Sequence, residues 1–461
     1  MHAIAPLRGK TVGVLGLARS GIAVARVLAR NGIGVVVYDD NPQAIEPLLA
    51  EGMRPGRIED VARLDVLVVS PGVPLTHPRP HPVVAAAREA GILLTCDIDL
   101  FARPLRELGH TLVVVTGTNG KSTTTALIHH LALVAGKRVL IGGNIGLPVF
   151  ELKPGSKPTI VVLELSSFQL DLCNDLRPDI AVWMNLTPDH LDRHGDLDGY
   201  IRAKSRVFAR MGTSDEAIIC IDDEPSRAVA QSLAGRVAVT TFGRSGEAVV
   251  SIVGGDLRRG SRPLMDLRDL PSLRGDHNID NAAAATLALL RLGVDGTTIR
   301  NGLATFRSLP HRAEQVAVID HVRFINDSKA TNPSSAARSL RTFPNIYWIA
   351  GGKPKPGGFS ELLSLMRPVR HLYLIGEAAD EMVATFEGVV PCTRHAGLAE
   401  AMRAAHDAAL ADRTGEATVL LAPACASYDQ FRSYEERGDR FREIAMSMAS
   451  GERLQPLGGA A

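Results

Sequence analysis

The stretch that decides the fold is Thr111-Leu-Val-Val-Val-Thr-Gly-Thr-Asn-Gly-Lys-Ser-Thr123. Its apolar first half predicts a buried strand, and the Ala-, Leu- and Ile-rich residues after it predict a helix. Glycines between a strand and a helix let the backbone approach phosphate oxygens, while the start of the helix presents free N–H groups. Lys121 can neutralise the β- and γ-phosphates and the Ser122 hydroxyl can bind magnesium, so the stretch predicts an ATP site.

This turn departs from the strict G-x-x-x-x-G-K-[ST] pattern, because Val115 stands at the position of the first glycine. An ordinary strand-to-helix turn is therefore the alternative interpretation. The order of strand, glycines, lysine and hydroxyls favours the nucleotide site over that alternative.

Apolar runs alternate with helical stretches on both sides of this turn, which predicts mostly parallel α/β sheets. Ahead of it, Thr11 to Leu15, a helix from Ile22 to Ala29 and a second run ending at Asp39 form a βαβ unit, followed by a strand at Val66 to Val69. Further strands are predicted at Arg138 to Ile141, Thr159 to Leu163, Ile180 to Met184, Val316 to Ile319, Ile346 to Ala350, His371 to Ile375 and Thr418 to Leu421. We therefore expect a Rossmann-like domain at 1–97, a P-loop ATPase-like domain at 98–308 and a second Rossmann-like domain at 309–461.

The composition excludes several classes of protein. Lys and Arg number 51 against 50 Asp and Glu, so the chain lacks the excess positive charge of a nucleic-acid or membrane-surface binder. The start, MHAIAPLRGK, does not resemble a signal peptide, and no apolar stretch is long enough to span a membrane. Five scattered cysteines form no C-x-x-C pair and are interpreted as reduced, buried side chains. We expect a cytoplasmic protein and a monomer.

Polar side chains follow two further strands at the edge where ligands bind in open α/β sheets. Glu164 comes directly after an apolar run and is a candidate metal ligand or general base, with a solvated strand-end carboxylate as the alternative. Asp189 and His190 follow the next run, although a lone histidine is more often structural. Their convergence on the edge that carries Lys121 favours a shared site.

Other polar positions leave their alternatives open. Lys204 lies on a predicted helix from Tyr200 to Arg210 and, by itself, indicates only a solvated face. Asn278 and Asn281 precede an Ala-rich helix and suit either an adenine or ribose contact or a helix cap. Three later segments after strands suit phosphate or anion binding, or simply turns: Asp327 to Lys329, Gly351 to Lys355 and Pro423 to Ser427.

The motifs, taken together, resemble the Mur ligase family over essentially the whole chain. The resemblance is carried by GTNGKST, GGNIGLP, LELSSFQL, NLTPDHLDRH, GDHNIDNAAAA, LPHR, INDSKATNP and APACASYDQF with the following Glu-Arg-Gly. It implies an ATP-dependent ligase of peptidoglycan precursor synthesis that joins D-glutamate to UDP-N-acetylmuramoyl-L-alanine through an acyl phosphate. In such ligases the first domain holds the UDP substrate and the second binds ATP with two magnesium ions. The third domain closes to bring in the amino acid.

The same resemblance implies a role for each matching residue. Catalysis is assigned to Lys121, Glu164, His190 and Lys204, and the metal ligands are Ser122, Glu164, His190 and Lys204, the last as a carbamate. ATP contacts are assigned to Gly117, Thr118, Asn119, Gly120, Lys121, Ser122, Thr123, Asn278, Asn281, Arg312, Asp327 and Lys329. The UDP substrate is assigned to Arg19, Ser20, Asp39, Ser70, Gly72, Asn144 and His190, and D-glutamate to Thr331, Lys355, Ser427 and Tyr434.

Three residues, in two places, depart from familiar members of the family. Asp40-Asn41 replaces a hydroxyl and an arginine after the acid, and Tyr434 replaces a phenylalanine. These departures concern the uridine contacts and the D-glutamate pocket respectively.

Three other functions compete with this interpretation. Gly16, Gly21 and Asp39 imitate the fingerprint of a nicotinamide enzyme, but the glycines do not form G-x-G-x-x-G. A P-loop switch protein would hydrolyse ATP without needing an amino acid and a carboxylate acceptor. A folyl-polyglutamate synthetase-like ligase usually begins near its P-loop, whereas a whole α/β segment precedes it in this chain.

Overall fold

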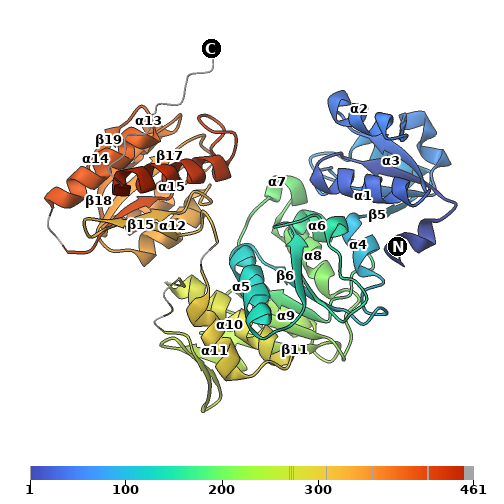
Figure 1. The fold of residues 1–461 in the computed structure, drawn as a ribbon, viewed down its shortest axis with the longest axis horizontal. Coiled ribbons are helices and arrows are strands. Elements are labelled where there is room, and N and C mark those ends of the chain that lie inside the picture. Colours follow the sequence, from blue (N-terminus) through green and yellow to red (C-terminus); the bar gives the residue numbers. More distant parts are fainter. Residues whose placement is uncertain are drawn as a thin grey trace. The chain divides into compact units, whose positions relative to one another are not determined.

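The computed structural model describes residues 2–268, 270, 272–273, 275–307, 309–355, 357–412 and 415–450. It contains three sheets and divides into two compact units (Figure 1). Unit 1 comprises Met1–Leu270 with Asn278–Phe306, and unit 2 comprises Pro271–His277 with Arg307–Ala461. The expected domain boundary at Ser308 lies outside the described residues. Among the helices that the structure describes, none has the length and apolar character needed to cross a membrane.

The first sheet of unit 1 is parallel throughout, in the order β3-β2-β1-β4-β5. Its strands are β1 (Thr11–Leu15), β2 (Gly34–Tyr38), β3 (Arg54–Pro55), β4 (Val66–Val69) and β5 (Leu93–Thr95). The helices around it are η1 (His2–Leu7), α1 (Arg19–Arg30), α2 (Pro42–Ala50), η2 (Ile58–Arg63), α3 (Pro82–Glu89) and α4 (Asp97–Ala102). The valine-rich strands are buried because helices cover both faces of such a sheet. This is the Rossmann-like arrangement that the sequence predicts.

The second sheet of unit 1 has nine strands in the order β14-β13-β12-β11-β10-β9-β6-β8-β7. They are β6 (Thr111–Thr116), β7 (Val139–Gly143), β8 (Ile160–Glu164), β9 (Ile180–Trp183), β10 (Glu216–Cys220), β11 (Ala238–Gly243), β12 (Val250–Val253), β13 (Asp256–Arg259) and β14 (Arg262–Asp266). Only the pairs formed by β13 are antiparallel. Because β6 lies between β8 and β9, the residues that follow these three strands meet at one edge.

Helices of the second sheet alternate with its strands. They are α5 (Lys121–Val134), η3 (Val149–Glu151), α6 (Ser167–Leu172), α7 (Leu191–His194), α8 (Leu197–Ser205), η4 (Arg206–Phe208), α9 (Glu224–Ser232), α10 (Asp276–Arg291) and α11 (Gly296–Thr305). The helix expected from Tyr200 to Arg210 therefore begins three residues earlier and ends sooner, at Ser205, before a short 3-10 turn.

The sheet of unit 2 has the order β15-β16-β20-β17-β18-β19, and only β15 and β16 pair antiparallel. Its strands are β15 (Glu314–Ile319), β16 (Val322–Asn326), β17 (Ile346–Gly351), β18 (Val369–Ile375), β19 (Cys392–Arg394) and β20 (Ala417–Leu421). Its helices are α12 (Pro333–Thr342), η5 (Ser360–Leu365), α13 (Ala379–Phe386), α14 (Leu398–Ala411) and α15 (Tyr434–Ser450). One apolar cluster includes residues of α12 and α13, and the other includes residues of α14 and α15. Helices thus cover both faces of the sheet, as expected for a doubly wound domain.

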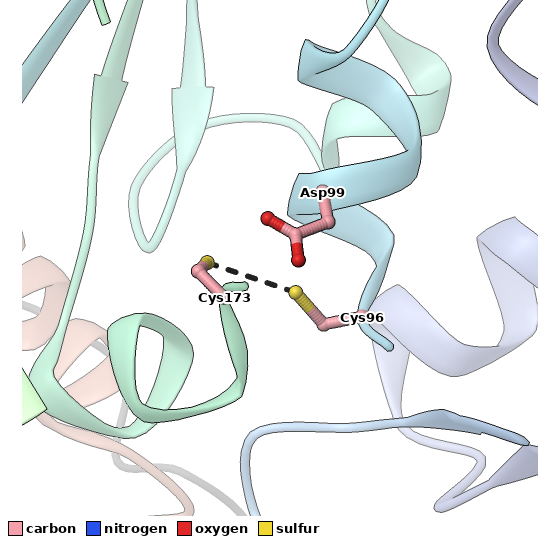
Figure 2. Close-up of side chains that lie close together, drawn as sticks. All are labelled: Cys96, Asp99 and Cys173. Atoms are coloured by element: carbon pink, nitrogen blue, oxygen red, sulfur yellow. Dashed lines mark hydrogen bonds between the residues drawn. The ribbon is translucent and has the colours of Figure 1, made fainter. Parts of the chain in front are cut away.

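A buried cluster joins the first sheet's last helix to the second sheet's α6 (Figure 2). Cys96 Sγ lies 3.7 Å from Cys173 Sγ, and Asp99 accepts the backbone N–H of Asn174 at 2.6 Å. Burial raises the pKa of both thiols, which keeps them protonated and unreactive. All five cysteines are free. The cluster is therefore interpreted as packing.

Asp97, next to this cluster, should make the stability of unit 1 depend on pH. Burial raises its pKa to about 6, above the value near 4 of an unfolded chain. Because the folded protein binds this proton more tightly than the unfolded chain does, the free energy of unfolding falls as pH rises from about 4 to about 6. Above about pH 6 it stays lower by the full amount. We expect Asp97→Asn to stabilise the protein at pH 7.5 by up to about 3 kcal/mol and to leave it unchanged near pH 4, measured by urea unfolding.

Glu89→Gln, which changes an exposed acid on α3, is the control for this prediction and should shift the urea midpoint at neither pH. Equal stabilisation by Asp97→Asn at both pH values would contradict the assignment of the effect to a buried charge.

Candidate nucleotide and ligation site

The glycine-rich turn connects β6 to α5, as predicted, and has a backbone that only glycine adopts easily. Gly117 has φ of 141° and Gly120 has φ of 83°. A Cβ at Gly120 would lie 2.4 Å from Asn281 Oδ1, so the position also excludes any side chain on steric grounds. The turn therefore brings backbone N–H groups to the start of α5 with nothing projecting over them.

The loop that follows β9 holds this turn in place. Asn185 accepts from Asn119 N at 2.9 Å and donates to Asn119 O at 3.1 Å, and its own carbonyl accepts from Thr118 N. Thr118 Oγ1 also lies 3.1 Å from Tyr200 Oη. Neither Asn185 nor Tyr200 was predicted to have a role from the sequence, although Asn185 opens the NLTPDHLDRH motif.

Two lysines share one backbone carbonyl in this turn. Lys121 Nζ donates to Gly117 O at 2.9 Å, and Lys204 Nζ donates to the same oxygen at 2.8 Å. Lys204 is 1% exposed on α8, which packs against α6, so it is not the solvated lysine that its helix pattern suggests. Burial, with Lys121 adding to it, lowers the pKa of Lys204 well below its usual value. The surroundings of Lys204 therefore disfavour a second ammonium group beside the half-buried Lys121.

Glu164 ends β8 in the same region and is also 1% exposed. One carboxylate oxygen accepts from Asn144 Nδ2 at 2.7 Å, whereas Oε2 is buried and has no hydrogen-bond partner among the described residues. An unsatisfied buried carboxylate oxygen costs free energy unless a cation or donor completes it. Glu164 is therefore not a solvated strand-end carboxylate, because its side chain is buried and one of its oxygens has no partner among the described residues.

His190 precedes α7 with φ of 54° and is half exposed. Its Nε2 lies 3.5 Å from Asp189 Oδ2, and its ring packs on Phe168 with centroids 4.8 Å apart. Burial lowers the pKa of His190, Asp189 opposes this shift, and Lys121 and Lys204 reinforce it. A neutral imidazole beside two lysines is the form that binds a metal ion.

The Ala-rich helix α10 reaches the nucleotide turn through Asn281, which is 2% exposed. Its Oδ1 accepts from Thr124 Oγ1 at 3.2 Å, and its Nδ2 donates to Asn278 Oδ1 at 3.0 Å. Asn281 is thus part of the turn's surroundings and not a helix cap, which settles one alternative left open by the sequence.

Except for Asn144 and His190, which lie in loops of the second sheet, the residues assigned to the UDP substrate lie at the carboxyl edge of the first sheet. Asp39 accepts from Leu17 N at 2.6 Å and from Asn41 N at 2.9 Å, and Ser70 Oγ donates to Gly16 O. Arg19 donates to Gly146 O at 3.0 Å, in the loop that also carries Asn144. Ser20 lies on the first turn of α1 and Gly72 follows β4. Asp40, the departing residue, pairs with His81 at 3.2 Å, and Asn41 caps α2.

In unit 2 the residues assigned to ATP follow β16 or precede β15. Asp327 accepts from Ala313 N at 3.2 Å and from Ser339 Oγ at 2.6 Å, and burial raises its pKa. Lys329 Nζ lies 3.7 Å from the centroid of the Tyr434 ring. Arg312 is the last residue of LPHR, two residues before β15, and its charge opposes the raised pKa of Asp327.

The residues assigned to D-glutamate come from four segments of unit 2. Thr331 follows β16, Lys355 follows β17, Ser427 follows β20, and Tyr434 begins α15. Lys355 is exposed and Ser427 is 2% exposed. The loops of Lys355 and Ser427 are joined by backbone hydrogen bonds between Lys353 and Ala426. The structure thus brings the segments that contain these four residues to one edge of the third sheet.

Comparison with known proteins agrees with this geometry. The models of the Mur ligase middle domain and of the Mur ligase glutamate ligase domain match residues 115–289 and 311–425. A protein from Rhodospirillum rubrum named UDP-N-acetylmuramoylalanine–D-glutamate ligase is 44% identical over 98% of this chain and 97% of its own. The chain belongs to the Mur ligase family. A Phenylobacterium zucineum protein of the same name is 42% identical to this Mur ligase over 98% of it and 99% of the relative.

Solved Mur ligases also share the fold. UDP-N-acetylmuramate-alanine ligase from Thermotoga maritima superposes with a TM-score of 0.59 at 18% identity, covering 95% of this chain and 100% of that one. The family resemblance and the α/β fold with mostly parallel sheets, both predicted from the sequence, are confirmed. Mur ligases are ATP-dependent ligases that need magnesium, and this excludes the nicotinamide enzyme and the switch protein as alternatives.

Proposed function

We propose that this Mur ligase joins D-glutamate to UDP-N-acetylmuramoyl-L-alanine in peptidoglycan precursor synthesis, through an acyl phosphate. The observation that carries the proposal is the 44% identity over 98% of the chain to a relative with that name. Identity at this level over both chains supports the same substrates as well as the same fold. The choice of D-glutamate rests on this likeness and is what the assay below tests.

The residues around the nucleotide turn fit a magnesium-bound triphosphate. The unpartnered Glu164 Oε2 and the Ser122 hydroxyl are suitable oxygen ligands for one ion. We assign a second ion to His190 and to Lys204 in its carbamate form. Bound magnesium would offset the negative charge that gathers on the γ-phosphate during transfer.

A carbamate on Lys204 would place an anionic group beside Lys121, where a second ammonium group is disfavoured. The lysine amine adds to carbon dioxide and loses a proton, which replaces a buried cation by an anion. The lowered pKa of Lys204 favours this reaction, because only the neutral amine is nucleophilic. The product would offer carboxylate oxygens next to Lys121, where an ammonium is repelled.

In the first step we assign, the alanyl carboxylate attacks the γ-phosphorus, a carboxyl–phosphate bond forms, and the bond to ADP breaks. Lys121 would leave its resting carbonyls and stabilise the charge on the transferred phosphoryl group. In the second step the neutral amine of D-glutamate attacks the acyl carbon, loses a proton, and inorganic phosphate leaves. Water must be kept from the acyl phosphate, since hydrolysis would waste it.

Phosphate release from ATP tests the whole proposal in one assay. The purified chain is given ATP, magnesium and UDP-N-acetylmuramoyl-L-alanine, with D-glutamate, L-glutamate, L-lysine or diaminopimelate as the amino acid. Among the four amino acids, we expect only D-glutamate to support sustained phosphate release. Equal release with another amino acid, or release that needs no UDP substrate, would overturn the proposal.

Two substitutions in unit 2 should affect D-glutamate rather than ATP. Ser427→Ala and Lys355→Ala each remove a group assigned to the carboxylates of D-glutamate, so the apparent KM for D-glutamate should rise about tenfold or more. The KM for ATP and the thermal midpoint should stay close to those of the wild type. Ser364→Ala, at an exposed position of η5, is the matched control. An unchanged KM in the folded variants would place the amino-acid pocket elsewhere.

A further inference from the structure

Arg437 is a buried arginine with an unusual set of partners. It lies in the first turn of α15 and is 1% exposed. Its hydrogen bonds among the described residues go to a hydroxyl and to backbone carbonyls, with no carboxylate among their acceptors. Burial lowers its pKa to about 10, so the guanidinium remains charged at neutral pH. A buried charge is costly, and its retention here calls for a specific task.

The hydrogen bonds of Arg437 reach two separate loops. Nε donates to Ser328 Oγ at 3.0 Å, and Nη2 donates to Ser328 O at 3.0 Å. Nη2 also donates to Cys425 O at 3.2 Å, and Nη1 to Ala426 O at 3.4 Å. The planar guanidinium therefore ties the loop after β16 to the loop after β20.

A third loop also packs on this side chain. Gly352, after β17, has φ of 127°, and a Cβ there would lie 3.1 Å from Arg437 Nη1 and 2.2 Å from Ala426 O. Glycine at this position thus lets the β17 loop approach the guanidinium. The three loops are those that carry Thr331, Ser427 and Lys355, and Tyr434 lies three residues before Arg437, at the start of α15.

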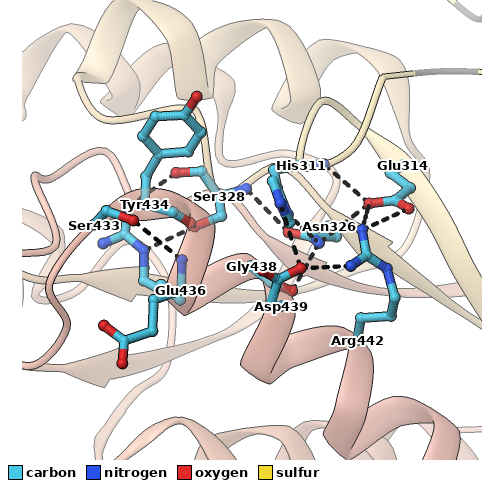
Figure 3. Close-up of polar contacts among 11 residues, drawn as sticks. His311, Glu314, Asn326, Ser328, Ser433, Tyr434, Glu436, Gly438, Asp439 and Arg442 are labelled. Carbon is cyan, nitrogen blue, oxygen red and sulfur yellow. Dashed lines mark hydrogen bonds and ion pairs between the residues drawn. The ribbon is translucent and has the colours of Figure 1, made fainter. Parts of the chain in front are cut away.

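The neighbouring residues of α15 anchor the same region (Figure 3). Ser328 Oγ donates to Tyr434 O at 2.8 Å, and Asn326 Nδ2 donates to Gly438 O at 3.0 Å. A Cβ at Gly438 would lie 2.1 Å from His311 Nδ1, so its absence makes room for that ring. The start of α15 is therefore the common support of loops that are far apart in sequence.

We propose that Arg437 is a positioning residue for the amino-acid pocket, which sets the spacing of the three loops without touching D-glutamate. The inference rests on the proposed function, because that function assigns Thr331, Lys355, Ser427 and Tyr434 to D-glutamate. Lysine cannot replace arginine in this role, since a single ammonium cannot donate along the several fixed directions of a guanidinium.

The test compares Arg437→Lys with the wild type in the phosphate-release assay, together with thermal unfolding. The apparent KM for D-glutamate should rise about tenfold or more, on the scale of losing charged hydrogen bonds. The KM for UDP-N-acetylmuramoyl-L-alanine, whose assigned residues lie in unit 1, should remain within about twofold of the wild-type value. Arg440→Lys, on the same helix but paired with Glu443 at the surface, is the matched control and should change neither constant.

Ser328→Ala provides a second variant, which adds no charge and removes the hydroxyl that accepts from Arg437 Nε and donates to Tyr434 O. It should raise the KM for D-glutamate by about threefold or more, because both a hydrogen bond from the charged guanidinium and one to Tyr434 O are lost. A folded Arg437→Lys or Ser328→Ala protein with wild-type KM for D-glutamate would overturn the inference and leave the proposed function intact. A wild-type chain that releases no phosphate in response to D-glutamate would instead overturn the proposed function, and the inference with it.

Discussion

Lys204→Ala should reduce kcat by about a thousandfold, the upper end of the range for losing one preorganised charge-stabilising group. The substitution removes a buried side chain that reaches the carbonyl of Gly117, in the middle of the nucleotide turn. If the working form is a carbamate, the cavity left by alanine should admit a small carboxylate. Acetate in the assay should therefore restore part of the lost activity, with formate as a smaller second probe.

Arg202→Ala is the control for this experiment, because Arg202 lies on the same helix with a side chain that is 73% exposed. Its turnover should be close to that of the wild type, and acetate should not alter it. Near-normal turnover of Lys204→Ala would contradict a role in catalysis. Loss of activity that no carboxylate restores would contradict the carbamate.

Lys121→Ala should lower kcat by about a hundredfold or more, with the fold unchanged. Its Nζ donates to the carbonyls of Gly117 and Thr118, so the side chain lies folded over the turn and has only a short distance to move toward a phosphate. We expect the loss in single-turnover formation of the acyl phosphate, because the charge of Lys121 acts on the phosphoryl transfer rather than on amide formation.

Lys137→Ala, at an exposed position beyond the end of α5, removes the same type of side chain outside the site and should leave kcat unchanged. Wild-type turnover in Lys121→Ala would count against the nucleotide turn as the site of ATP binding.

The sequence predicts the centre of the second sheet well. The strand and helix on either side of the turn are observed at Thr111–Thr116 and Lys121–Val134, because long apolar runs and glycines are strong local signals. The same reasoning predicted that Glu164 and His190 would meet at the edge that carries Lys121, since consecutive parallel strands end on one side. The structure agrees with that placement, while the catalytic roles stay predictions.

Other features depend on contacts that a local pattern does not show. The strands β12 to β14 were missed because they are short and partly exposed, although Gly254, Gly255 and Gly260 mark the turns between them with positive φ. Lys204 looked solvated because its burial comes from the packing of α8 on α6. Arg437 had no assigned role because most of its partners are backbone carbonyls, which no sequence pattern marks. One partner, Ser328, also lies 109 residues away along the chain.

The contact between Thr124 and Asn281 spans 157 residues of sequence. A chain emerging from the ribosome thus carries its glycine-rich turn long before the asparagine that completes the turn's surroundings has been synthesised. Because non-local contacts form only after their loops close, nucleotide affinity should appear late in translation, once α10 has emerged. Stalled nascent chains that end before α10 should therefore fail to retain ATP, however well their first sheet has already folded.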